Sequence, residues 1–295
     1  MFDLPSTLQP IVNECTQRAK LHLLLKRDDL IHPEISGNKW RKLKYNLEQA
    51  RTEGKSRLVT FGGAFSNHIT ATAAAGKYLD FETVGIIRGE PHHPLNSSLQ
   101  FAQDCGMQFI YLDRTHYRDK DILSISSHPL LTENDRIYWL PEGGANMLAV
   151  KGCEEIVSEI DTHFDFICAA CGTGTTLAGM AAALSPKQIA IGFPVLKNGE
   201  FLYDDIRRLT NADCQLMTDY HFGGYAKTTP ELIQFIHTFY QEQQVLLDYV
   251  YTGKMMYGIF DLIQRGWFPE GSVIIAVHTG GVQNANVFNL KSSEL

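Results

Sequence analysis

Three glycine-containing loops in this chain combine small residues with hydroxyl, amide or imidazole groups that can do chemistry. They are residues 62–68 (GGAFSNH), 171–176 (CGTGTT) and 278–281 (HTGG), and each follows a short apolar run. In an open parallel sheet, the loops that follow the strands lie at one edge and form ligand sites. One glycine turn of this kind says little, whereas three in one chain point to a ligand site at a sheet edge.

The second loop, formed by Gly172, Thr173, Gly174, Thr175 and Thr176, has the composition of a phosphate site. Glycine lets the backbone approach a ligand closely, and the free N–H groups at a helix start point outward. The loop matches neither the Walker pattern nor the G-x-G-x-x-G dinucleotide spacing. A strand-to-helix turn whose hydroxyls cap the helix is the alternative, and spacing alone does not separate the two.

A lysine opens another predicted helix. Ser36 or Asn38 can cap this helix, so that Lys39 lies in its first turn. The helix dipole disfavours a cation there. A partly buried amine in that place would have a lowered pKa, which helps a nucleophile that forms a Schiff base. The alternative is a solvated basic patch, since basic residues crowd positions 41–44, and for this segment considered alone the patch is the better interpretation.

Two further segments offer polar groups. Ser66, Asn67 and His68 stand at a predicted helix start, where N–H groups and short polar side chains can hold a carboxylate. A capping serine or asparagine explains them equally well. Residues 249–254 (YVYTGK) end a short apolar run in polar groups. A buried tyrosine hydroxyl usually just finds a partner, but it can also act as an acid, base or nucleophile.

The elements that must position these residues alternate between short apolar runs and longer helical patterns. The expected strands are residues 21–25, 58–61, 83–87, 108–112, 166–170, 189–193 and 272–277. The expected helices are residues 39–49, 67–78, 97–105, 149–160, 175–184, 230–240, 254–264 and 282–290. The polar stretch 115–135 is interpreted as a surface connection around one weak helix. Nearly continuous apolar strands alternating with helices predict an α/β fold of open, mostly parallel sheets with helices on both faces.

Composition narrows the classes of partner. The chain has 295 residues and a net charge of -7, which gives no electrostatic reason to expect a nucleic acid or an anionic membrane. The first residues lack a signal-peptide pattern, and no apolar run is long enough to span a bilayer. The six scattered cysteines are interpreted as reduced thiols in a cytoplasm. Cys168 and Cys171 lack the second pair that a zinc site needs, so we expect a buried strand-end cysteine and a loop cysteine.

Five segments in this order resemble a known family. They are similar to the tryptophan-synthase-β type (fold type II) of pyridoxal-phosphate enzymes. Within it they resemble the branch of 1-aminocyclopropane-1-carboxylate deaminase and D-cysteine desulfhydrase. One such motif is weak, but five in order are specific. The matching segments are residues 26–29 (KRDD), 37–43 (GNKWRKL), 62–68 (GGAFSNH), 172–179 (GTGTTLAG) and 251–254 (YTGK).

The resemblance implies pyridoxal 5'-phosphate as the cofactor. Lys39 would hold it as a Schiff base and would act as the base at the substrate α-carbon. The loop of residues 172–176 would cradle its phosphate. Asn67 would hydrogen-bond its ring hydroxyl, and Thr252 would face its ring nitrogen. The protein would thus position and tune a cofactor that serves as the electron sink.

The resemblance also implies a small amino-acid substrate. Ser66, with Asn67 and His68 beside it, would meet the substrate carboxylate. Tyr225 and Tyr251 match the two tyrosines that stand near the substrate. Lys39, Ser66 and these two tyrosines are the expected catalytic residues. The loop departs from the family in Ala64-Phe65, where a longer polar residue is common, and Phe65 is expected to reshape the substrate pocket.

Thr252 suggests which reaction the chain performs. The deaminases have a glutamate at this place, and a neutral hydroxyl stabilises a protonated ring less well than a carboxylate does. Elimination of a good leaving group tolerates a weaker electron sink. We therefore expect a desulfhydrase-like β-elimination from D-cysteine to pyruvate, ammonia and sulfide. The alternative is 1-aminocyclopropane-1-carboxylate deaminase, which opens a ring to give 2-oxobutanoate and ammonia. A noncatalytic α/β protein that binds a phosphate ligand would share the loops without needing Lys39.

Two domains are expected. Residues 1–46 and 151–295 would form a large cofactor-binding domain, and residues 47–150 a small inserted one. The cofactor would lie in the cleft between them, because loops of both would supply its ligands. A homodimer is expected from the resemblance and from the general frequency of such assemblies.

Overall fold

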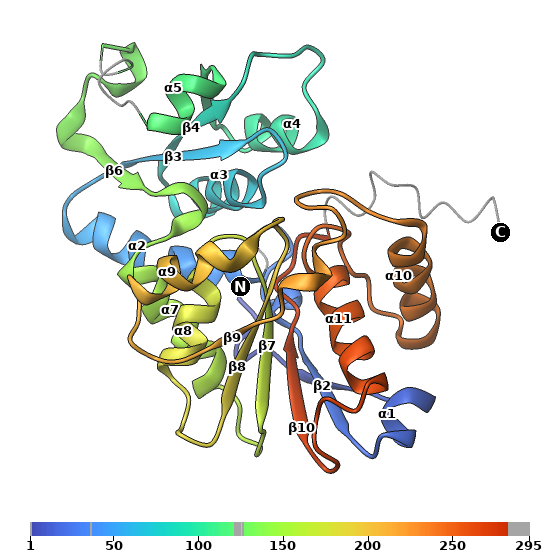
Figure 1. The fold of residues 1–295 in the computed structure, drawn as a ribbon. Helices are drawn as coiled ribbons and strands as arrows, with labels where there is room; N and C mark the ends of the chain where they lie inside the picture. Colours follow the sequence, from blue (N-terminus) through green and yellow to red (C-terminus); the bar gives the residue numbers. More distant parts are fainter. Residues whose placement is uncertain (1, 36, 121–124, 126, 283–295) are drawn as a thin grey trace. The chain divides into compact units, whose positions relative to one another are not determined.

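The computed structural model describes residues 2–35, 37–120, 125 and 127–282, which form two compact units (Figure 1). Unit 1 consists of the described residues of Met1–Arg41 and Val150–Leu295, and unit 2 is Lys42–Ala149. The assignment of one domain to the cofactor stays a prediction. Ser36, proposed as a helix cap, and residues 283–290 of the last expected helix lie outside the described residues.

Unit 1 is built on a six-stranded sheet in the order β1-β2-β10-β7-β8-β9, in which β1 is antiparallel to β2 and the other pairs are parallel. The strands are β1 Leu8–Ile11, β2 His22–Lys26, β7 Phe166–Cys171, β8 Ile189–Pro194, β9 Gln215–Leu216 and β10 Val273–Val277. Strand β10 pairs with β2 along its whole length. This pairing brings the segments that follow these two strands to the same edge, although they are far apart in the sequence.

Helices cover both faces of this sheet, and strand β7 shows why. Phe166, Cys168 and Ala170 pack into a core with α10 and α11, whereas the alternate residues pack into a core with α7, α8 and α9 (Figure 1). A strand buried on both faces is apolar throughout. The helices of unit 1 are α1 Glu14–Arg18, α8 Thr175–Ala182, α9 Leu202–Arg207, α10 Pro230–Gln243 and α11 Thr252–Gln264, with most of α7 Met147–Ser158. Cys171 ends the strand and is buried, so the prediction that it is a loop cysteine was wrong.

Unit 2 holds an all-parallel sheet in the order β5-β4-β3-β6. Ile87 of β4 packs against α3 and α4, while its neighbour Ile86 packs on the opposite face with Tyr117 of α5. The strands are β3 Arg57–Gly63, β4 Glu82–Arg88, β5 Gln108–Leu112 and β6 Ile137–Leu140. The helices are α2 Asn38–Thr52, whose first residues belong to unit 1, α3 Asn67–Leu79, α4 Ser97–Asp104 and α5 Arg114–Asp119. The predicted α/β class is confirmed.

The elements that were not predicted are short. Strand β1 contains Pro10 and pairs on one side only, as edge strands with proline do. Strand β9 has two residues, and β6 is a four-residue apolar run that follows the polar stretch 115–135. The described part of the connection 115–135 includes most of α5 and the 3-10 turns at Pro129–Leu131 and Asn134–Arg136. The described turns of 3-10 helix are Asp28–Leu30, Pro129–Leu131, Asn134–Arg136, Glu142–Gly144, Gly199–Phe201 and Thr218–His221.

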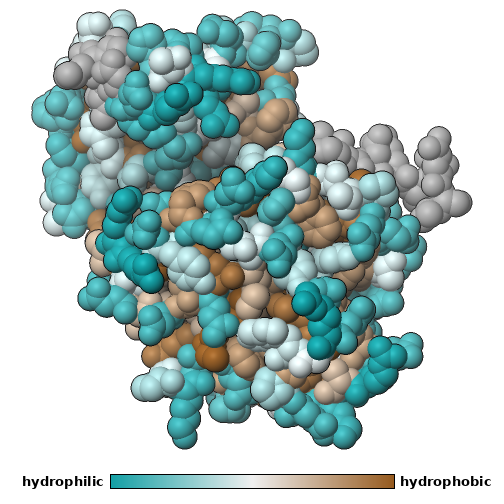
Figure 2. Space-filling model, viewed as in Figure 1, coloured by the Kyte–Doolittle hydropathy of each residue, from teal (hydrophilic) through white to brown (hydrophobic). Residues whose placement is uncertain are grey.

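The visible surfaces of both units are mainly hydrophilic, with apolar side chains in small separate areas (Figure 2). Among the described helices, none combines the length and the apolar character that crossing a bilayer requires.

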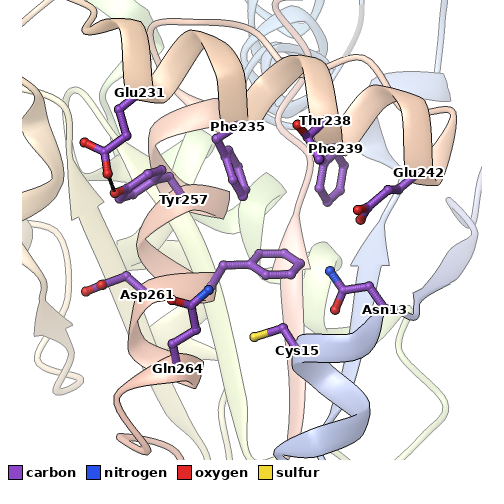
Figure 3. A pocket seen from close by; sticks show the side chains of 11 residues that line it. Asn13, Cys15, Glu231, Phe235, Thr238, Phe239, Glu242, Tyr257, Asp261 and Gln264 are labelled. Carbon is purple, nitrogen blue, oxygen red and sulfur yellow. Dashed lines mark hydrogen bonds between the residues drawn. The ribbon is translucent and has the colours of Figure 1, made fainter.

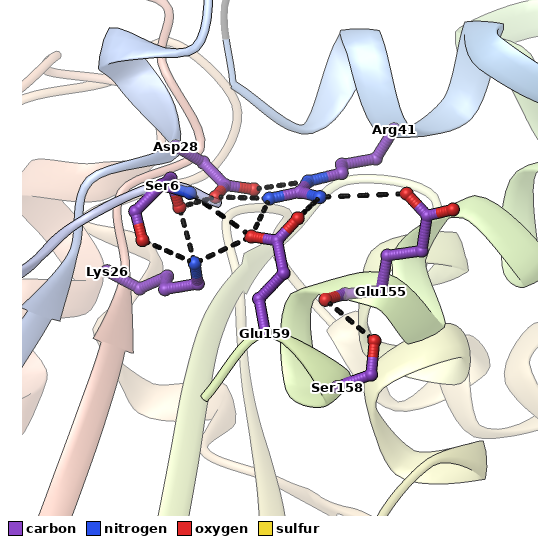
Figure 4. A network of polar contacts seen from close by, with 7 residues as sticks. All are labelled: Ser6, Lys26, Asp28, Arg41, Glu155, Ser158 and Glu159. Carbon is purple, nitrogen blue, oxygen red and sulfur yellow. Dashed lines mark hydrogen bonds and ion pairs between the residues drawn. The ribbon is translucent and has the colours of Figure 1, made fainter. Parts of the chain in front are cut away.

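A buried network of charges joins three elements of unit 1 (Figure 4). Arg41 in α2 donates to both carboxylate oxygens of Asp28 at 3.1 and 3.0 Å, and to Glu159, which follows α7, at 2.7 Å. Lys26 at the end of β2 donates to the same Glu159 at 2.8 Å and to Ser6. The side chains of Arg41, Lys26 and Asp28 are 0% exposed.

This network corrects the interpretation of residues 41–44 as a solvated basic patch. Arg41 is enclosed by carboxylates, and Lys42 is also buried, with its Nζ donating to the carbonyl of Gly143 at 3.2 Å. Burial by itself would raise the pKa of Glu159, but hydrogen bonds from Arg41 and Lys26 lower it below its ordinary value. The start of α2 is therefore held by paired charges rather than by solvent.

We predict that Arg41→Met lowers the free energy of unfolding by about 3–5 kcal/mol, because Asp28 and Glu159 would be left as buried charges without their main partner. Urea unfolding followed by circular dichroism measures the change. The matched control is Arg208→Met, which breaks an exposed pair with Asp205 at 3.0 Å and should change the free energy by less than about 1 kcal/mol. Equal effects of the two substitutions would contradict the proposed importance of the network.

Candidate active site

The loop that follows β7 has the form of an anion site. Gly174 is the N-cap residue of α8 and has φ +72°, so the cap position has no side chain to accept from the first N–H groups of the helix. The alternative interpretation, in which a hydroxyl side chain caps α8, is therefore wrong at this N-cap position. Thr175 and Thr176 are buried in the first turn. A glycine turn leading to a helix start without a side-chain cap fits a phosphate group.

Lys39 stands beside this loop within unit 1. Helix α2 begins at Asn38, so Lys39 lies in its first turn as predicted. The Asn38 amide donates to the hydroxyl of Thr176 at 2.9 Å. Gly37 has φ +65°, and a Cβ atom there would lie 2.0 Å from the carbonyl oxygen of Thr279. Only glycine fits this position, and the residues next to Lys39 are thereby fixed against both the HTGG loop and the start of α8.

The two predicted tyrosines lie together. The rings of Tyr225 and Tyr251 are 6.1 Å apart between centroids and meet edge to face. Tyr251 is the N-cap residue of α11, and a Cβ atom on Gly172 would lie 3.3 Å from its ring. The tyrosine pair thus adjoins the glycine loop. Tyr249, in contrast, is buried with its hydroxyl 3.3 Å from His237 Nε2, which is the ordinary fate of a core tyrosine.

Lys254 is a residue whose position the sequence motif did not explain. It is buried in the first turn of α11, and its Nζ donates to the carbonyls of His221 and Gly224, both at 2.8 Å. Burial lowers its pKa to about 8. The side chain ties α11 to the segment that immediately precedes Tyr225. In the sequence, Lys254 lies within the largely apolar stretch VYTGKMM, and this pattern could have indicated that its side chain is buried.

Thr252 is buried and bonded to an aspartate that the sequence reasoning missed. Its hydroxyl donates to Asp248 Oδ1 at 2.7 Å and accepts from the backbone N–H of Asp248 at 3.0 Å. The same oxygen Oδ1 accepts from the N–H of Thr252, while Oδ2 accepts from the N–H groups of Val250 and Tyr251. The helix expected at residues 254–264 begins two residues earlier, at Thr252, so the polar end of the 249–254 segment forms the first turn of α11.

The remaining predicted residues form a local cluster in unit 2. Ser66 is the N-cap residue of α3, and its hydroxyl accepts from the N–H groups of His68 and Ile69 at 3.2 and 3.4 Å. Asn67 is the first residue of the helix. His68 is buried, with Nε2 2.8 Å from the hydroxyl of Thr60. The capping role of Ser66 is thus present, and the roles of the three residues toward a substrate stay predictions. Phe65, just before them, is exposed.

A separate pocket of about 350 Å³ lies in unit 1 between α1, α10 and α11 (Figure 3). It has apolar walls from Phe235, Phe239 and Phe260 and a rim of polar groups. Glu231 accepts a hydrogen bond from Tyr257, which raises the pKa of that tyrosine to about 12. The predicted site residues do not line this pocket. Within the described residues, no group of three or more His, Cys, Asp or Glu side chains could hold a metal ion.

Comparison with known proteins assigns the family. The family model of pyridoxal-phosphate dependent enzymes matches residues 9–280 of the chain. The chain belongs to this family. The cofactor of the enzyme is therefore pyridoxal phosphate, and the geometry of the residue 172–176 loop fits its phosphate.

Several relatives have names within one branch of this family. The enzyme is 32% identical to a putative 1-aminocyclopropane-1-carboxylate deaminase of Pyrococcus horikoshii, over 88% of this chain and 84% of the relative. It is 30% identical to a bifunctional D-cysteine desulfhydrase/1-aminocyclopropane-1-carboxylate deaminase, mitochondrial, of Arabidopsis thaliana, over 88% and 72% of the two chains. It is 26% identical to a D-cysteine desulfhydrase of Yersinia enterocolitica, over 88% and 86%.

Solved structures agree with the family. A homologue of 1-aminocyclopropane-1-carboxylate deaminase superposes with a TM-score of 0.82 at 29% identity, covering 97% of this chain and 93% of the other. An O-ureido-L-serine synthase superposes with a TM-score of 0.72 at 12% identity, covering 98% and 94%, and shows the shared fold.

We predict that Gly174→Ala weakens the binding of pyridoxal phosphate by about tenfold or more, because a displaced loop no longer holds its N–H groups where the phosphate needs them. A left-handed alanine costs about 1–2 kcal/mol, which favours a change of backbone conformation. Its Cβ atom would also lie 2.7 Å from Ile206 Cγ1, so the loop must shift. Titration of the cofactor-free protein with pyridoxal phosphate, followed by fluorescence, measures the affinity. Gly266→Ala is the control, because Gly266 has φ +66° with open space around its Cβ position. It should cost stability but leave the affinity unchanged, and an unchanged affinity in Gly174→Ala would argue against the loop as the phosphate site.

Proposed function

We propose that the enzyme eliminates sulfide from a small sulfur amino acid, with D-cysteine as the preferred substrate. As a pyridoxal-phosphate-dependent lyase, it would convert D-cysteine and water to pyruvate, ammonia and hydrogen sulfide. The observation that best supports an imine-forming lysine is the hydrogen bond from Asn38 to Thr176, which holds the residue before Lys39 against the first turn of α8.

The chain's own residues would divide the work as follows. Bound pyridoxal phosphate supplies an electron sink for the charge that develops at the substrate α-carbon. The Nζ atom of Lys39 would hold the cofactor at rest and, once the substrate amine has displaced it, would take the α-proton. The N–H groups of the residue 172–176 loop would bind the phosphate. Asn67 would hydrogen-bond the ring hydroxyl of the cofactor.

The substrate would be oriented by two groups of residues. Ser66, with Asn67 and His68 beside it, would bind the carboxylate through groups at the start of α3. Tyr225 and Tyr251 would stand near the substrate side chain, where a tyrosine hydroxyl can exchange a proton with a reacting atom. The close packing of these two rings, with Lys254 holding the segment before Tyr225, supports their acting as a pair.

Two names among the relatives bear on the substrate. The Yersinia enterocolitica relative is called a D-cysteine desulfhydrase, which agrees with Thr252 in place of the glutamate of the deaminases. The name of the Pyrococcus horikoshii relative favours 1-aminocyclopropane-1-carboxylate as the second candidate substrate, and the name of the Arabidopsis thaliana relative gives both activities. Thiolate is a good leaving group, so sulfide elimination makes the smaller demand on the electron sink.

The test begins with the lysine. Borohydride reduction of the enzyme with its cofactor should attach a pyridoxyl group to the peptide that contains Lys39, as read by mass spectrometry. Lys39→Ala should lose this label and nearly all turnover, while Lys44→Ala, on the same helix, should keep both. D-Cysteine, L-cysteine and 1-aminocyclopropane-1-carboxylate are then assayed for pyruvate or 2-oxobutanoate and compared by kcat/KM.

The outcomes separate the candidates. The highest kcat/KM for D-cysteine would support the proposal. Efficient ring opening without release of sulfide would replace it by the deaminase function. A protein that binds pyridoxal phosphate without a reducible bond to Lys39, and without turnover of any of these substrates, would be the noncatalytic phosphate-binding protein.

We also propose a homodimer in the cytoplasm. Closed two-fold dimers are the commonest assemblies of soluble enzymes, and the six cysteines are scattered along the chain rather than spaced as a disulfide framework, as expected in a reducing compartment. Sedimentation at micromolar concentration should give twice the chain mass of 33.1 kDa, and a monomer would contradict the assembly.

A further inference from the structure

The hydrogen bonds of Thr252 determine where its single hydroxyl proton lies. A backbone N–H can only donate, so the Thr252 oxygen must accept from Asp248 N at 3.0 Å. An ionised carboxylate can only accept, so the hydroxyl proton must point to Asp248 Oδ1 at 2.7 Å. One lone pair and the proton are therefore both in use.

Asp248 has the hydrogen-bonding pattern of an ionised carboxylate. Each of its two oxygens accepts two hydrogen bonds. Three of the four donors are backbone N–H groups, and the fourth is the Thr252 hydroxyl. The side chain is buried, and among the described residues no salt bridge pairs it with a cation. The amine of Lys254 interacts with Asp248 electrostatically, but its hydrogen bonds are donated to the carbonyls of His221 and Gly224.

What is left on the Thr252 oxygen is a second lone pair. A hydroxyl oxygen can accept two hydrogen bonds, and the described residues supply one. Any group that meets this oxygen in its remaining direction must donate a proton to it. Thr252 therefore presents an acceptor backed by a buried negative charge, and not the neutral donor that its residue type suggests.

We propose that Asp248 acts through Thr252 as a positioning residue that makes the Thr252 oxygen an acceptor for a protonated ring nitrogen of the cofactor. This inference rests on the proposed function, in which Thr252 faces that nitrogen. The ring N–H donates to Thr252 Oγ1, whose own proton is donated to Asp248 Oδ1. No proton leaves this series of three groups, and the charge of the ring is balanced by Asp248, which the ring reaches through the Thr252 hydroxyl.

The consequence concerns the strength of the electron sink. A protonated ring withdraws electrons more strongly, so substrates with a poor leaving group come within reach. The Asp248–Thr252 pair would then do part of what the glutamate does in the deaminases. Thr252 alone, considered as a residue type, predicts a weak sink and elimination only. With Asp248 behind it, the site suits sulfide elimination and ring opening by one protein.

The experiment reads the ring nitrogen directly. Cofactor-free protein is loaded with pyridoxal phosphate labelled with ¹⁵N in the ring, and the ¹⁵N chemical shift is measured by solid-state NMR. Wild type and Thr252→Ser, which keeps the hydroxyl, should show the shift of a protonated ring nitrogen. Thr252→Val, which keeps the shape and removes the hydroxyl, should show that of an unprotonated one. Asp248→Asn should move toward the unprotonated value, because the amide lacks the charge.

Turnover gives a second readout. In Asp248→Asn and in Thr252→Val, kcat/KM for 1-aminocyclopropane-1-carboxylate should fall by a larger factor than kcat/KM for D-cysteine. A general loss of structure would lower both equally. If Asp248→Asn does not fold, the comparison of Thr252→Val with Thr252→Ser still decides the matter.

The results distinguish this inference from the proposed function. An unprotonated ring nitrogen in the wild type, or identical shifts in wild type and Thr252→Val, overturns the inference even if D-cysteine is the best substrate. A protonated nitrogen that depends on Thr252 and Asp248 upholds it even if the enzyme proves inactive on all three amino acids. Protein that takes up no pyridoxal phosphate overturns both.

Discussion

The enclosure of the Arg41 guanidinium is the constraint on which the candidate site depends. With no exposed surface, Arg41 cannot leave Asp28 and Glu159 without stranding charges in the interior. These carboxylates belong to the segment after β2 and to the segment after α7, so they hold the start of α2 from two sides. Lys39 is two residues before Arg41 on the same helix. The network thereby determines where the backbone of Lys39, the proposed imine-forming residue, lies.

Close approaches of backbone complete this arrangement. Gly37 lies against the carbonyl of Thr279, and Gly172 lies against the ring of Tyr251, with no room for a larger residue at Gly37. The pairing of β2 with β10 makes the first of these contacts possible, because it places the segments after both strands at one edge. The parallel sheet thus places the polar loops of unit 1 at one edge, and the glycines let their backbones approach one another closely.

The N-cap residue and the first turn of α11 make three contacts on which the proposed site depends. Tyr251 lies against Gly172 of the residue 172–176 loop, Thr252 is bonded to Asp248, and Lys254 holds the segment that precedes Tyr225. A cofactor that acts as electron sink is tuned by the groups around its ring. In this enzyme Thr252, which we propose as a tuning group, and Lys254, which ties α11 to the segment before Tyr225, are neighbours on one helix, so a change in either can alter the other. This coupling explains why a single residue type at position 252 is an incomplete guide to the reaction.

The sequence by itself determined the α/β class, most of the long elements and the three glycine loops. These features depend on local periodicity and on residues such as Gly174, whose conformational freedom is a property of the residue itself. Family membership followed from the order of the same local motifs. Short elements such as β6 and β9 escaped prediction because so few residues have little periodicity, and their strand form comes from pairing with a neighbour.

Only the tertiary structure decided which charges are paired and which acceptor each hydroxyl proton is donated to. Arg41 and Glu159 are 118 residues apart in the sequence, so no local pattern indicates that Arg41 is buried rather than solvated. Asp248 is only four residues from Thr252, yet the turn that joins them depends on α11 beginning at Thr252, two residues before the start that the sequence predicts. Hydrogen bonds depend on direction as well as on separation, and direction is settled only when the chain has folded.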